Sequence, residues 1–343
     1  MLEKDKILKV LSEIKYPPYD RDIVSFGMVK YVKAEGSRAQ VRIFAGADSE
    51  RAREVVKKAS ELLASSFPGC EFDVELLKED PSSAPVSVNE NLLRNVRWKI
   101  AVASGKGGVG KSTVAVNLAR ALARKFSADT PRVGLMDCDV YGPSATILFG
   151  KKEFPAVDEN RKIIPPQIDG IKVISMGMLV DDDQPLIWRG PMVSSALKQF
   201  AEDVDWGDLD AMVMDFPPGT GDAVLSMVQT VPISGALIVT TPNSLAAQTA
   251  ARGAMLFGKS NVKILGLVEN MAYFQMPDGS KEFVFGEGYA DGAAAHLGIP
   301  VLARIPIDKS LYSSAPSESV SAAFDALADE VLKALEGPEG VRG

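Results

Sequence analysis

The stretch SGKGGVGKST, residues 104–113, combines four glycines with two lysines. Within it, Gly105, Gly110, Lys111 and Ser112 satisfy the pattern G-x-x-x-x-G-K-[ST] of a phosphate-binding loop. Glycines let backbone N–H groups approach phosphate oxygens, and the N-terminus of a following helix favours negative charge. Lys111 would neutralise the β- and γ-phosphates, and Ser112 would coordinate Mg²⁺. The stretch therefore predicts a nucleoside triphosphate site.

The same glycines, G-x-G-x-x-G from residue 105, also fit the dinucleotide fingerprint. That fingerprint requires an acidic residue about 20 positions further on, at the end of the second strand. Asp129 lies in a polar turn, and Asp137 comes later than this spacing. A dinucleotide site would also leave the lysine and serine at the end of the motif unexplained. The phosphate loop is therefore the preferred interpretation.

Three aspartates stand where predicted strands end. Asp215 closes the run DAMVMD, and Asp137 and Asp139 follow the run RVGLM. The carboxyl ends of parallel strands meet at one edge of a sheet, where ligands bind. Asp139 and Asp215 are therefore predicted to hold Mg²⁺ together with Ser112, while Asp137 and Asp139 could orient the attacking water. Single acids at strand ends are common turn formers, but three that face one loop favour a catalytic site.

The chain after residue 95 alternates short apolar runs with helical stretches. Apolar runs without alternation are typical of strands buried on both faces of a parallel sheet. The runs lie at 98–104, 132–137, 171–176, 210–215, 235–241, 262–270 and 300–306. The predicted helices lie at 111–126, 191–204, 222–230, 244–258, 289–297 and 317–336. This alternation predicts an α/β domain with a doubly wound, mostly parallel sheet over residues 96–337, followed by a tail at 338–343.

Residues 1–79 predict a separate small α+β unit of the order αββαβ. The expected elements are a helix at 3–14, strands at 22–32 and 38–45, a helix from residue 48 or 49 to 67, and a strand at 71–77. Residues 80–95 are rich in Pro, Ser and Asn, which indicates a linker. Two domains are also what a chain of 343 residues favours.

The composition restricts the classes of partner and compartment. With 38 basic and 45 acidic residues, the net charge is −7, which gives no large field for nucleic acid or an anionic membrane. We therefore expect neither partner. Cys70 and Cys138 cannot form a disulfide framework. The N-terminus has no signal-peptide core, and no apolar run reaches about 18 residues, so a cytoplasmic location is expected.

Several motifs, taken together, resemble one known family. The chain contains GKGGVGKST, DCDVYGPS, SMGML, IWRGPM, DFPPGTGD, GLVENM and FGEG. These motifs resemble those of the Mrp/ApbC-type iron–sulfur cluster carrier ATPases over about residues 96–310. That family belongs to the deviant-Walker class with MinD, ParA and the nitrogenase iron protein. Residues 1–79 resemble the small iron–sulfur assembly-factor domain that is often fused ahead of this ATPase, and the likeness depends on DIVSFGMV.

The resemblance implies a role for Lys106, which a phosphate loop alone does not require. In this class the first lysine of the loop reaches across a two-fold axis to the phosphates held by the other subunit. An added cation of this kind can raise the rate about 10³–10⁵-fold. The resemblance thus implies a homodimer through the nucleotide face, with ATP and Mg²⁺ as cofactors. The alternative is a solvated loop lysine.

The resemblance also implies the nucleotide contacts. The side chain of Asn270 would hydrogen-bond the adenine edge, although a strand-end cap is the alternative. Pro306 and Asp308 would help to close the base pocket. The loop residues that would surround the phosphates are Gly105, Lys106, Gly107, Gly108, Val109, Gly110, Lys111, Ser112 and Thr113.

The sequence departs from the family in the segment ENMAYFQMPDGSKEF. Members of the family carry a Cys-x-x-Cys pair there, through which two subunits share one cluster. In this chain Met276 and Gly279 stand at those positions. Iron–sulfur clusters need thiolates or occasionally imidazole, so the usual cluster site is absent. Cys138 is the remaining weak candidate ligand, and cluster binding stays open.

The sequence leaves two candidate functions. The first is a slow, dimer-coupled ATPase that serves cluster delivery to acceptor apoproteins, or works with iron–sulfur assembly proteins. The second is a cluster-free switch in which the nucleotide state decides which protein is bound. A membrane-targeting variant would need a basic amphipathic C-terminal helix, but residues 317–336 are predominantly acidic.

Overall fold

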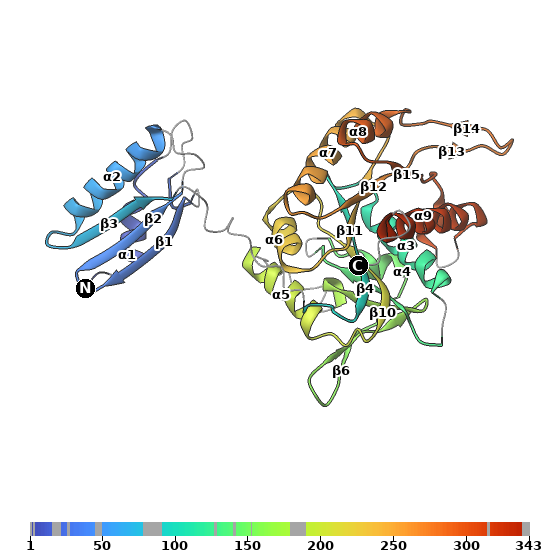
Figure 1. The fold of residues 1–343 in the computed structure, drawn as a ribbon, viewed down its shortest axis with the longest axis horizontal. Coiled ribbons are helices and arrows are strands. Elements are labelled where there is room, and N and C mark those ends of the chain that lie inside the picture. The colour runs from blue at the N-terminus through green and yellow to red at the C-terminus, as the bar shows by residue number, and fades with distance from the viewer. Residues whose placement is uncertain are drawn as a thin grey trace. The chain divides into compact units, whose positions relative to one another are not determined.

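The computed structural model describes residues 2, 4–15, 22–25, 28–44, 50–77, 91–126, 129–139, 142–151, 153–178, 190–313 and 316–337. The chain divides into two compact units, Met1–Val86 and Ser87–Gly343 (Figure 1). Each unit has its own hydrophobic core, and each is described by itself. The linker proposed at 80–95 lies mostly outside the described residues, and the tail at 338–343 lies wholly outside them.

The smaller unit is a three-stranded sheet backed by two helices. Its elements are α1 (Lys4–Leu11), β1 (Val29–Glu35), β2 (Arg38–Ile43), α2 (Glu50–Ser66) and β3 (Glu71–Leu76). The order is β1-β2-β3, with β1 antiparallel and β3 parallel to β2. Alternate residues of β2 are buried in a core that includes Ile7, Leu11, Val41, Ile43 and Leu63.

The first strand of this unit starts later than the sequence pattern predicts. A strand was expected over 22–32, but regular pairing begins at Val29. The carboxylate of Asp22 accepts hydrogen bonds from the backbone N–H groups of Val24, at 2.9 Å, and Ser25, at 2.8 Å. Such local bonds compete with strand pairing and form a turn. The predicted start of the strand was wrong because β-propensity does not take into account the side-chain hydrogen bonds that form this turn.

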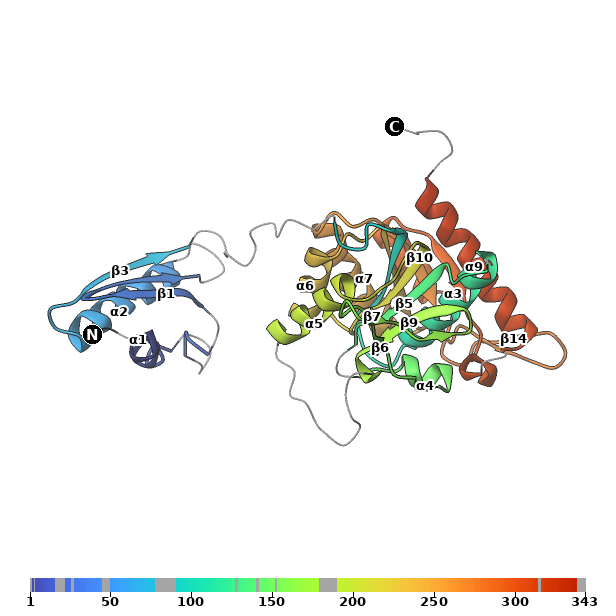
Figure 2. The same cartoon turned by 90° about the horizontal axis from the view of Figure 1, so that it is seen from below.

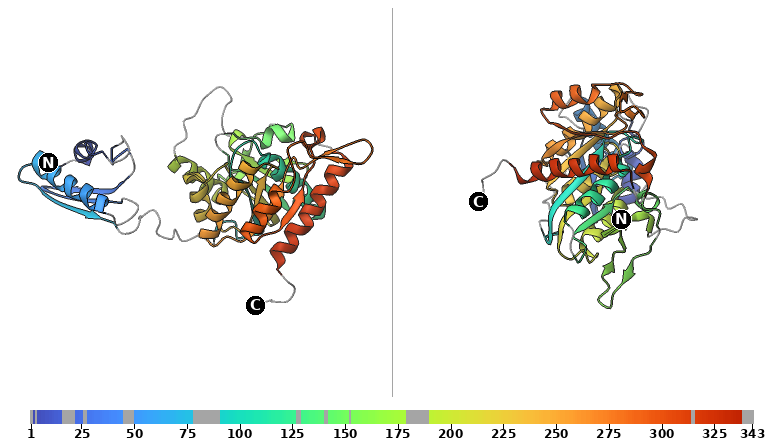
Figure 3. Two further views of the ribbon diagram at one scale, coloured as in Figure 1. Left: turned by 90° about the horizontal axis from the view of Figure 1, so that it is seen from above. Right: turned by 90° about the vertical axis from the view of Figure 1, so that its right-hand side faces the viewer.

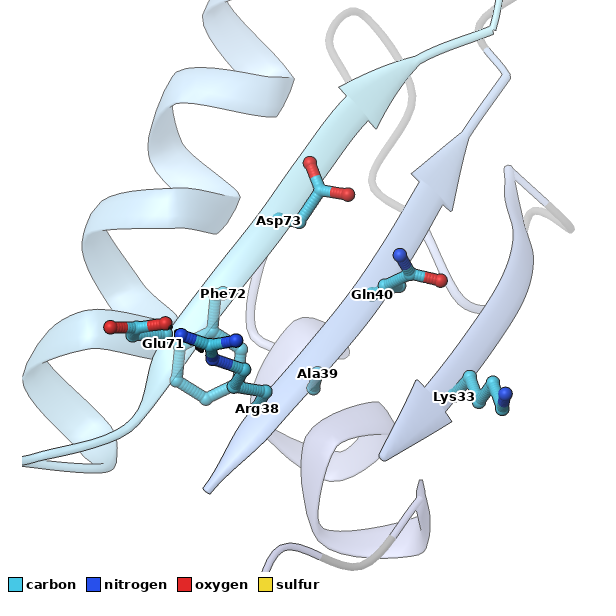
Figure 4. Close-up of a pocket in the computed structure, with 7 residues that line it drawn as sticks. All are labelled: Lys33, Arg38, Ala39, Gln40, Glu71, Phe72 and Asp73. Carbon is cyan, nitrogen blue, oxygen red and sulfur yellow. Dashed lines mark hydrogen bonds and ion pairs between the residues drawn. The ribbon is translucent and has the colours of Figure 1, made fainter. Parts of the chain in front are cut away.

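The opposite face of the small sheet is polar and open. Figure 4 shows a shallow pocket there, where side chains of β2 and β3 meet. Arg38 pairs with Glu71 at 2.7 Å between Nε and Oε2, and Arg42 pairs with Asp73 at 2.7 Å between Nη2 and Oδ2. Exposed pairs of this kind contribute little free energy, so they define the surface rather than stabilise the fold.

The larger unit is built on eight strands in the order β15-β12-β11-β4-β10-β5-β9-β8. Seven of them run parallel, and only β8 is antiparallel to its neighbour β9. Their apolar residues are buried on both faces, as the runs without alternation predict. The strands are β4 (Val96–Ser104), β5 (Val133–Asp137), β8 (Gln167–Ile168), β9 (Ile171–Ser175), β10 (Leu209–Asp215), β11 (Gly235–Thr240), β12 (Ile264–Glu269) and β15 (Val301–Arg304).

Helices cover both faces of this sheet (Figures 1 and 2). One core joins the sheet to α3, α4 and α9, and a second core joins it to α5, α6, α7 and α8. The doubly wound α/β fold is therefore confirmed. The helices are α3 (Lys111–Lys125), α4 (Ala145–Phe149), α5 (Gly190–Glu202), α6 (Asp222–Thr230), α7 (Ser244–Lys259), α8 (Tyr289–Leu297), α9 (Glu318–Glu336) and the 3₁₀ helices η2 (Met176–Met178) and η3 (Lys309–Tyr312).

Two short hairpins complete the unit. The first pairs β6 (Ala156–Val157) with β7 (Ile163–Ile164), and the second pairs β13 (Phe274–Gln275) with β14 (Lys281–Glu282). Strands of two residues are too short to show a period, so the sequence did not predict them. Within the described part of the chain, no helix is both long enough and apolar enough to span a membrane.

Candidate functional site

The loop between β4 and α3 is held in a shape that only glycine allows. A Cβ on Gly105 would collide with the backbone carbonyl of Thr249 in α7. Gly108 and Gly110 have φ values of 78° and 77°, which other residues rarely adopt. A Cβ on Gly110 would also collide with the side-chain amide of Asn270. The loop is therefore packed against two neighbouring elements.

The segment after β10 is tied to the same loop. The N–H of Phe216 donates to the carbonyl of Val102 at 3.0 Å, and the N–H of Gly219 donates to the carbonyl of Ser104 at 2.8 Å. The hydroxyl of Ser104 in turn donates to the carbonyl of Lys106 at 2.9 Å. These bonds place the residues DFPPGTG beside the loop, at the carboxyl edge of the sheet.

Lys111, Ser112 and Asp215 meet as the motifs predict. The Nζ atom of Lys111 lies 2.5 Å from Oδ1 of Asp215 and 3.2 Å from Oγ of Ser112. The side chains of Lys111 and Asp215 are only 6% and 3% exposed. Burial raises the pKa of Asp215, although the Lys111 ammonium opposes this shift. The site thus holds a buried ion pair where phosphate and metal are expected.

Asp137 lies in the protein interior and anchors the chain that carries Asp139. Its Oδ2 atom accepts hydrogen bonds from the N–H groups of Ser144 and Ala145, at 3.0 and 3.1 Å, and from the hydroxyl of Ser175 at 2.8 Å. Burial, with the nearby charge of Asp215, raises the pKa of Asp137 to about 6. This carboxylate therefore positions the turn before α4 and has no free face for a water molecule.

Asp139 follows this anchor and is 8% exposed. One of its oxygens accepts from the N–H of Gly142 at 3.2 Å, and its backbone N–H donates to Asp137 at 3.2 Å. Its charge helps to raise the pKa of Asp215, so the two carboxylates are electrostatic neighbours. Of the two acids predicted to orient water, Asp139 is the better placed.

Asn270, the residue that follows β12, is hydrogen-bonded to the phosphate loop. Its Nδ2 donates to the carbonyl of Val109 at 2.9 Å. Its Oδ1 is buried and has no hydrogen-bond partner among the described residues. A buried acceptor without a partner costs free energy, which indicates that a bound group supplies the missing donor. This unpartnered oxygen makes Asn270 a candidate contact for a bound group.

The segment that contains Pro306 and Asp308 runs beside Asn270. The N–H of Ile305 donates to the carbonyl of Glu269 at 2.9 Å, and that of Ile307 donates to the carbonyl of Tyr273 at 2.7 Å. Pro306 is buried in this segment.

The carboxylate of Asp308 is engaged within the chain. It accepts from the N–H of Ser310 at 2.7 Å and from the hydroxyl of Ser317 at 3.0 Å. The bond from Ser310 lowers the pKa of Asp308. Asp308 thus caps η3.

Lys106 differs from Lys111 in having no counter-ion among the residues that the structure describes. Its side chain is half-buried, and no ion pair or side-chain hydrogen bond links its ammonium to any residue that the structure describes. Its backbone is fixed by the bond from Ser104. Its backbone is thus anchored, while its ammonium group has no partner in the described part of the chain and is available to a bound anion.

The residues present do not fit a resident iron–sulfur cluster. Met276 and Gly279 form the tip of the β13–β14 hairpin, where the N–H of Gly279 donates to the carbonyl of Met276 at 3.0 Å. Neither offers a thiolate. Across the described ranges, no group of three or more His, Cys, Asp or Glu side chains could hold a metal ion.

Cys138 does not fit as a substitute ligand. Its thiol is fully buried in the core and contacts the carbonyl of Met136 at 3.4 Å. Burial raises its pKa well above the usual range, so the thiol stays protonated and unreactive. The burial of this side chain argues against Cys138 as an iron–sulfur ligand. Cys70 belongs to the smaller unit and is half-buried.

Glu269 is a buried acid to which none of the sequence motifs assigns a role. Its Oε2 accepts from Nε of Arg304 at 3.2 Å, while its Oε1 has no partner among the described residues. Nη2 of Arg304 also contacts both carboxylate oxygens of Asp291 in α8, at 2.5 and 2.6 Å. One feature of the sequence could have pointed to Glu269: it is an acidic residue that ends an apolar strand and directly precedes Asn270.

We expect a pH-dependent contribution from Glu269. Burial raises its pKa above 4.5 in the folded chain, so the folded state binds the proton more tightly than the unfolded state. The free energy of unfolding therefore falls as the pH rises from about 4.5 through the raised pKa. Glu269→Gln removes this slope. Urea unfolding of both proteins between pH 4.5 and 8 measures it, and parallel curves would contradict the expectation.

Several known proteins resemble this chain in sequence. Residues 95–336 match the model of the ParA-type family described as NUBPL iron-transfer P-loop NTPase. A protein of Arabidopsis thaliana named iron-sulfur protein required for NADH dehydrogenase, mitochondrial, is 45% identical over 274 residues, which are 77% of this chain and 87% of the relative. An iron-sulfur cluster carrier protein of Deinococcus radiodurans is 38% identical over 337 residues, 96% of this chain and 93% of the relative.

A solved structure supports the same fold. The nucleotide-binding protein of Archaeoglobus fulgidus, in complex with ADP, superposes with a TM-score of 0.57 at 35% identity. The match covers 69% of this chain and 90% of that protein. The phosphate loop, the doubly wound sheet and the matched residues agree, and the chain belongs to the NUBPL/ParA-type family of iron-transfer P-loop NTPases.

Proposed function

We propose that this protein binds ATP with Mg²⁺ and hydrolyses it as a homodimer in the service of iron–sulfur cluster delivery. The observation that carries the proposal is one edge of the sheet, where Lys111 and Asp215 form a buried pair and the Lys106 ammonium has no partner among the described residues. The names of the relatives support the cluster-related role.

The phosphates would bind along the loop 105–113. Lys111 would turn from Asp215 to the β- and γ-phosphates, and the backbone N–H groups of the loop would contact phosphate oxygens. The oxygen donors of Ser112, Asp139 and Asp215 suit Mg²⁺, which, when bound, would offset the phosphate charge. Lys106 would contact the phosphates of the partner protomer.

Asp139 would orient the attacking water. Its carboxylate is held by the N–H of Gly142, and its backbone is held by Asp137, so its direction is fixed before substrate arrives. Positioning and electrostatic stabilisation supply most of the catalysis in phosphoryl transfer. Asp137 therefore contributes by positioning, and Asp139 by contact with the water.

Asn270 would select adenine. Its unpartnered Oδ1 can accept the hydrogen bond that an adenine amino group donates, whereas guanine presents a carbonyl oxygen at that position and would be repelled. We expect Asn270→Ala to reduce the preference for ATP over GTP by about tenfold or more. Binding constants for both nucleotides measure this ratio. An unchanged ratio would show that Asn270 does not read the base.

A concentration series tests the dimeric ATPase. If each site needs Lys106 from a second protomer, ATP turnover per protomer must rise with protein concentration and then level off. Protomers that hydrolyse ATP independently would give a constant value. The measurement needs Mg²⁺ and no added iron, so its result does not depend on cluster chemistry.

The cluster-free switch is the second candidate, and the absence of thiolates at Met276 and Gly279 favours it. Anaerobic incubation with iron and sulfide, followed by iron analysis and transfer to an acceptor apoprotein, separates the two. Iron bound and transferred would support delivery. Protein without iron that still binds another protein in an ATP-dependent way would support the switch.

A further inference from the structure

An open cavity of about 450 Å³ lies at the end of α3 that is remote from the nucleotide loop. Its lining comes from the last turns of α3, from the segment that leads into β5 and from the turn between β8 and β9. Because β5 and β9 are parallel, the residues directly before them lie at the amino edge of the sheet. Helix α3 has 15 residues and is about 22 Å long, so the cavity and the loop are separate sites.

Three arginines line this cavity, which is here called the arginine cavity: Arg120, Arg124 and Arg132. The carboxylates in the lining are those of Asp129 and Asp169, so positive groups are in excess there. A guanidinium group carries five N–H donors in a fixed fork, which matches the oxygens of a carboxylate or a phosphate. The residue types thus indicate an acceptor-rich, anionic ligand.

Arg120 supplies the strongest indication of a ligand. Its side chain is only 5% exposed, and its Nε donates to Oδ2 of Asp169 at 3.0 Å. Its Nη1 donates to the carbonyl of Ser313 at 3.0 Å, and its Cζ lies over the ring of Phe149, 5.0 Å from the ring centre. Its Nη2 has no hydrogen-bond partner among the described residues. A buried cationic donor without an acceptor costs free energy, which favours a bound group that provides one.

The other two arginines are paired with carboxylates outside the lining. Nη2 of Arg124 lies 2.7 Å from Oδ1 of Asp325, and Nε of Arg132 lies 2.7 Å from Oδ2 of Asp210. Asp325 belongs to α9, the red helix that lies beside α3 in Figures 1 and 3. These pairs offset much of the positive charge but leave other N–H donors of each guanidinium group for a ligand. Recognition would therefore depend on directed donors more than on net charge.

We propose that the arginine cavity binds the phosphate group of a small molecule, at a site distinct from the nucleotide loop. Phosphate is the oxyanion that guanidinium forks bind best, through charge-assisted hydrogen bonds. The cavity is larger than a phosphate ion and has the size of a small-molecule site. Phe126, Pro131 and Pro316 in its lining offer apolar contact to an organic group attached to the phosphate. This inference does not depend on the proposed ATPase.

Asp169 would compete with the ligand for Arg120. Its side chain is partly exposed, and its φ of 52° lies in the left-handed region. A phosphate beside Arg120 would be repelled by this carboxylate. Asn has nearly the same shape and also adopts the left-handed region, so Asp169→Asn should keep the turn. We expect this variant to bind phosphate about threefold or more tightly, whereas a purely structural role for Asp169 gives no gain.

Isothermal titration calorimetry of the full chain with inorganic phosphate measures the site. Mg²⁺ and a saturating non-hydrolysable ATP analogue are present, so that the nucleotide loop is occupied. We expect Arg124→Gln with Arg132→Gln to weaken phosphate binding at least about tenfold. Arg97→Gln is the matched control and should change nothing, because Arg97 is an exposed arginine that pairs with Glu336 and does not line the cavity.

Arg120→Lys tests the buried arginine itself. Lysine keeps the positive charge but lacks the planar fork, so we expect weaker phosphate binding at unchanged net charge. Circular dichroism checks that every variant is folded. If Arg120→Lys does not fold, the double variant and Asp169→Asn still decide the question.

A second series of titrations replaces inorganic phosphate with ribose 5-phosphate. Tighter binding of the sugar phosphate would identify the ligand as a phosphorylated metabolite, and equal or weaker binding would identify it as free phosphate. In both cases the affinity must depend on the same arginines.

Three results would overturn the inference. The wild-type protein could bind neither probe, or the double variant could bind phosphate as tightly as the wild type. Phosphate binding that the ATP analogue abolishes and the arginine variants leave intact would belong to the nucleotide loop. ATP hydrolysis is measured without added phosphate, so none of these results bears on the proposed function.

Discussion

Lys106→Ala should lower ATP turnover by about 10³-fold or more while nucleotide binding to the monomer remains within a few-fold of wild type. The ammonium of Lys106 has no counter-ion among the described residues, so its removal leaves no buried charge unpaired. In the proposed dimer, its loss would withdraw one positive charge from the transition state in the partner's site. Lys259→Ala is the control, because Lys259 is an exposed lysine at the far end of α7. Steady-state hydrolysis and nucleotide titration measure the two effects.

A mixing experiment decides whether Lys106 acts on the partner. Asp139→Asn should bind ATP without cleaving it, yet it still carries Lys106. If the protein dimerises as proposed, mixing it with Lys106→Ala would give heterodimers in which the nucleotide of the Lys106→Ala protomer meets an intact Asp139 and a lysine from the partner. We expect hydrolysis to reappear in the mixture. If Lys106 acts within its own protomer, the mixture stays as inactive as its components.

The buried pair of Lys111 and Asp215 should dominate the stability of the nucleotide-free protein. Either Lys111→Met or Asp215→Asn leaves one buried group without its partner, which costs about 3–5 kcal/mol of unfolding free energy. The double variant removes both charges and should recover most of this loss. Nucleotide binding should be lost whenever Lys111 is replaced.

The pH dependence of the free energy of unfolding provides a second check on the pair of Lys111 and Asp215. Burial raises the pKa of Asp215, so in Lys111→Met the carboxyl group can protonate as the pH falls. The destabilisation should therefore grow as the pH rises from 3.8, the usual pKa of an aspartate, through the raised pKa of Asp215. Lys125→Ala is the control, since Lys125 pairs with Asp329 at 2.6 Å on the surface and should contribute at most about 1 kcal/mol. Urea unfolding without nucleotide measures the free energy of unfolding of all four variants. If the losses of the two single variants simply add up in the double variant, Lys111 and Asp215 are not coupled.

The sequence was sufficient for the fold of the larger unit and for much of its site. Short apolar runs between helical stretches predict a parallel sheet because the side-chain period decides burial. The carboxyl ends of those strands then bring Lys111, Ser112 and Asp215 together. Motifs of this kind place residues by local geometry, which a linear pattern records well.

Other features depend on contacts that no linear pattern contains. Asp137 and Asp139 have the same residue type and nearly the same position, yet one is sealed by hydrogen bonds from Ser144, Ala145 and Ser175 and the other is not. The pairing of Asn270 with Val109 joins segments 161 residues apart. The turn at Asp22 reflects side-chain bonds that compete with the strand.

The pairing of Lys111 with Asp215 has a consequence for the order of ligand entry. Without a ligand, the charges of Lys111 and Asp215 neutralise each other. A nucleotide phosphate that paired with Lys111 would leave the buried Asp215 carboxylate without a counter-ion, which is costly. A divalent cation that arrives with the triphosphate would meet that anion at once. We therefore expect the proposed site to bind the metal–nucleotide complex in preference to either component alone.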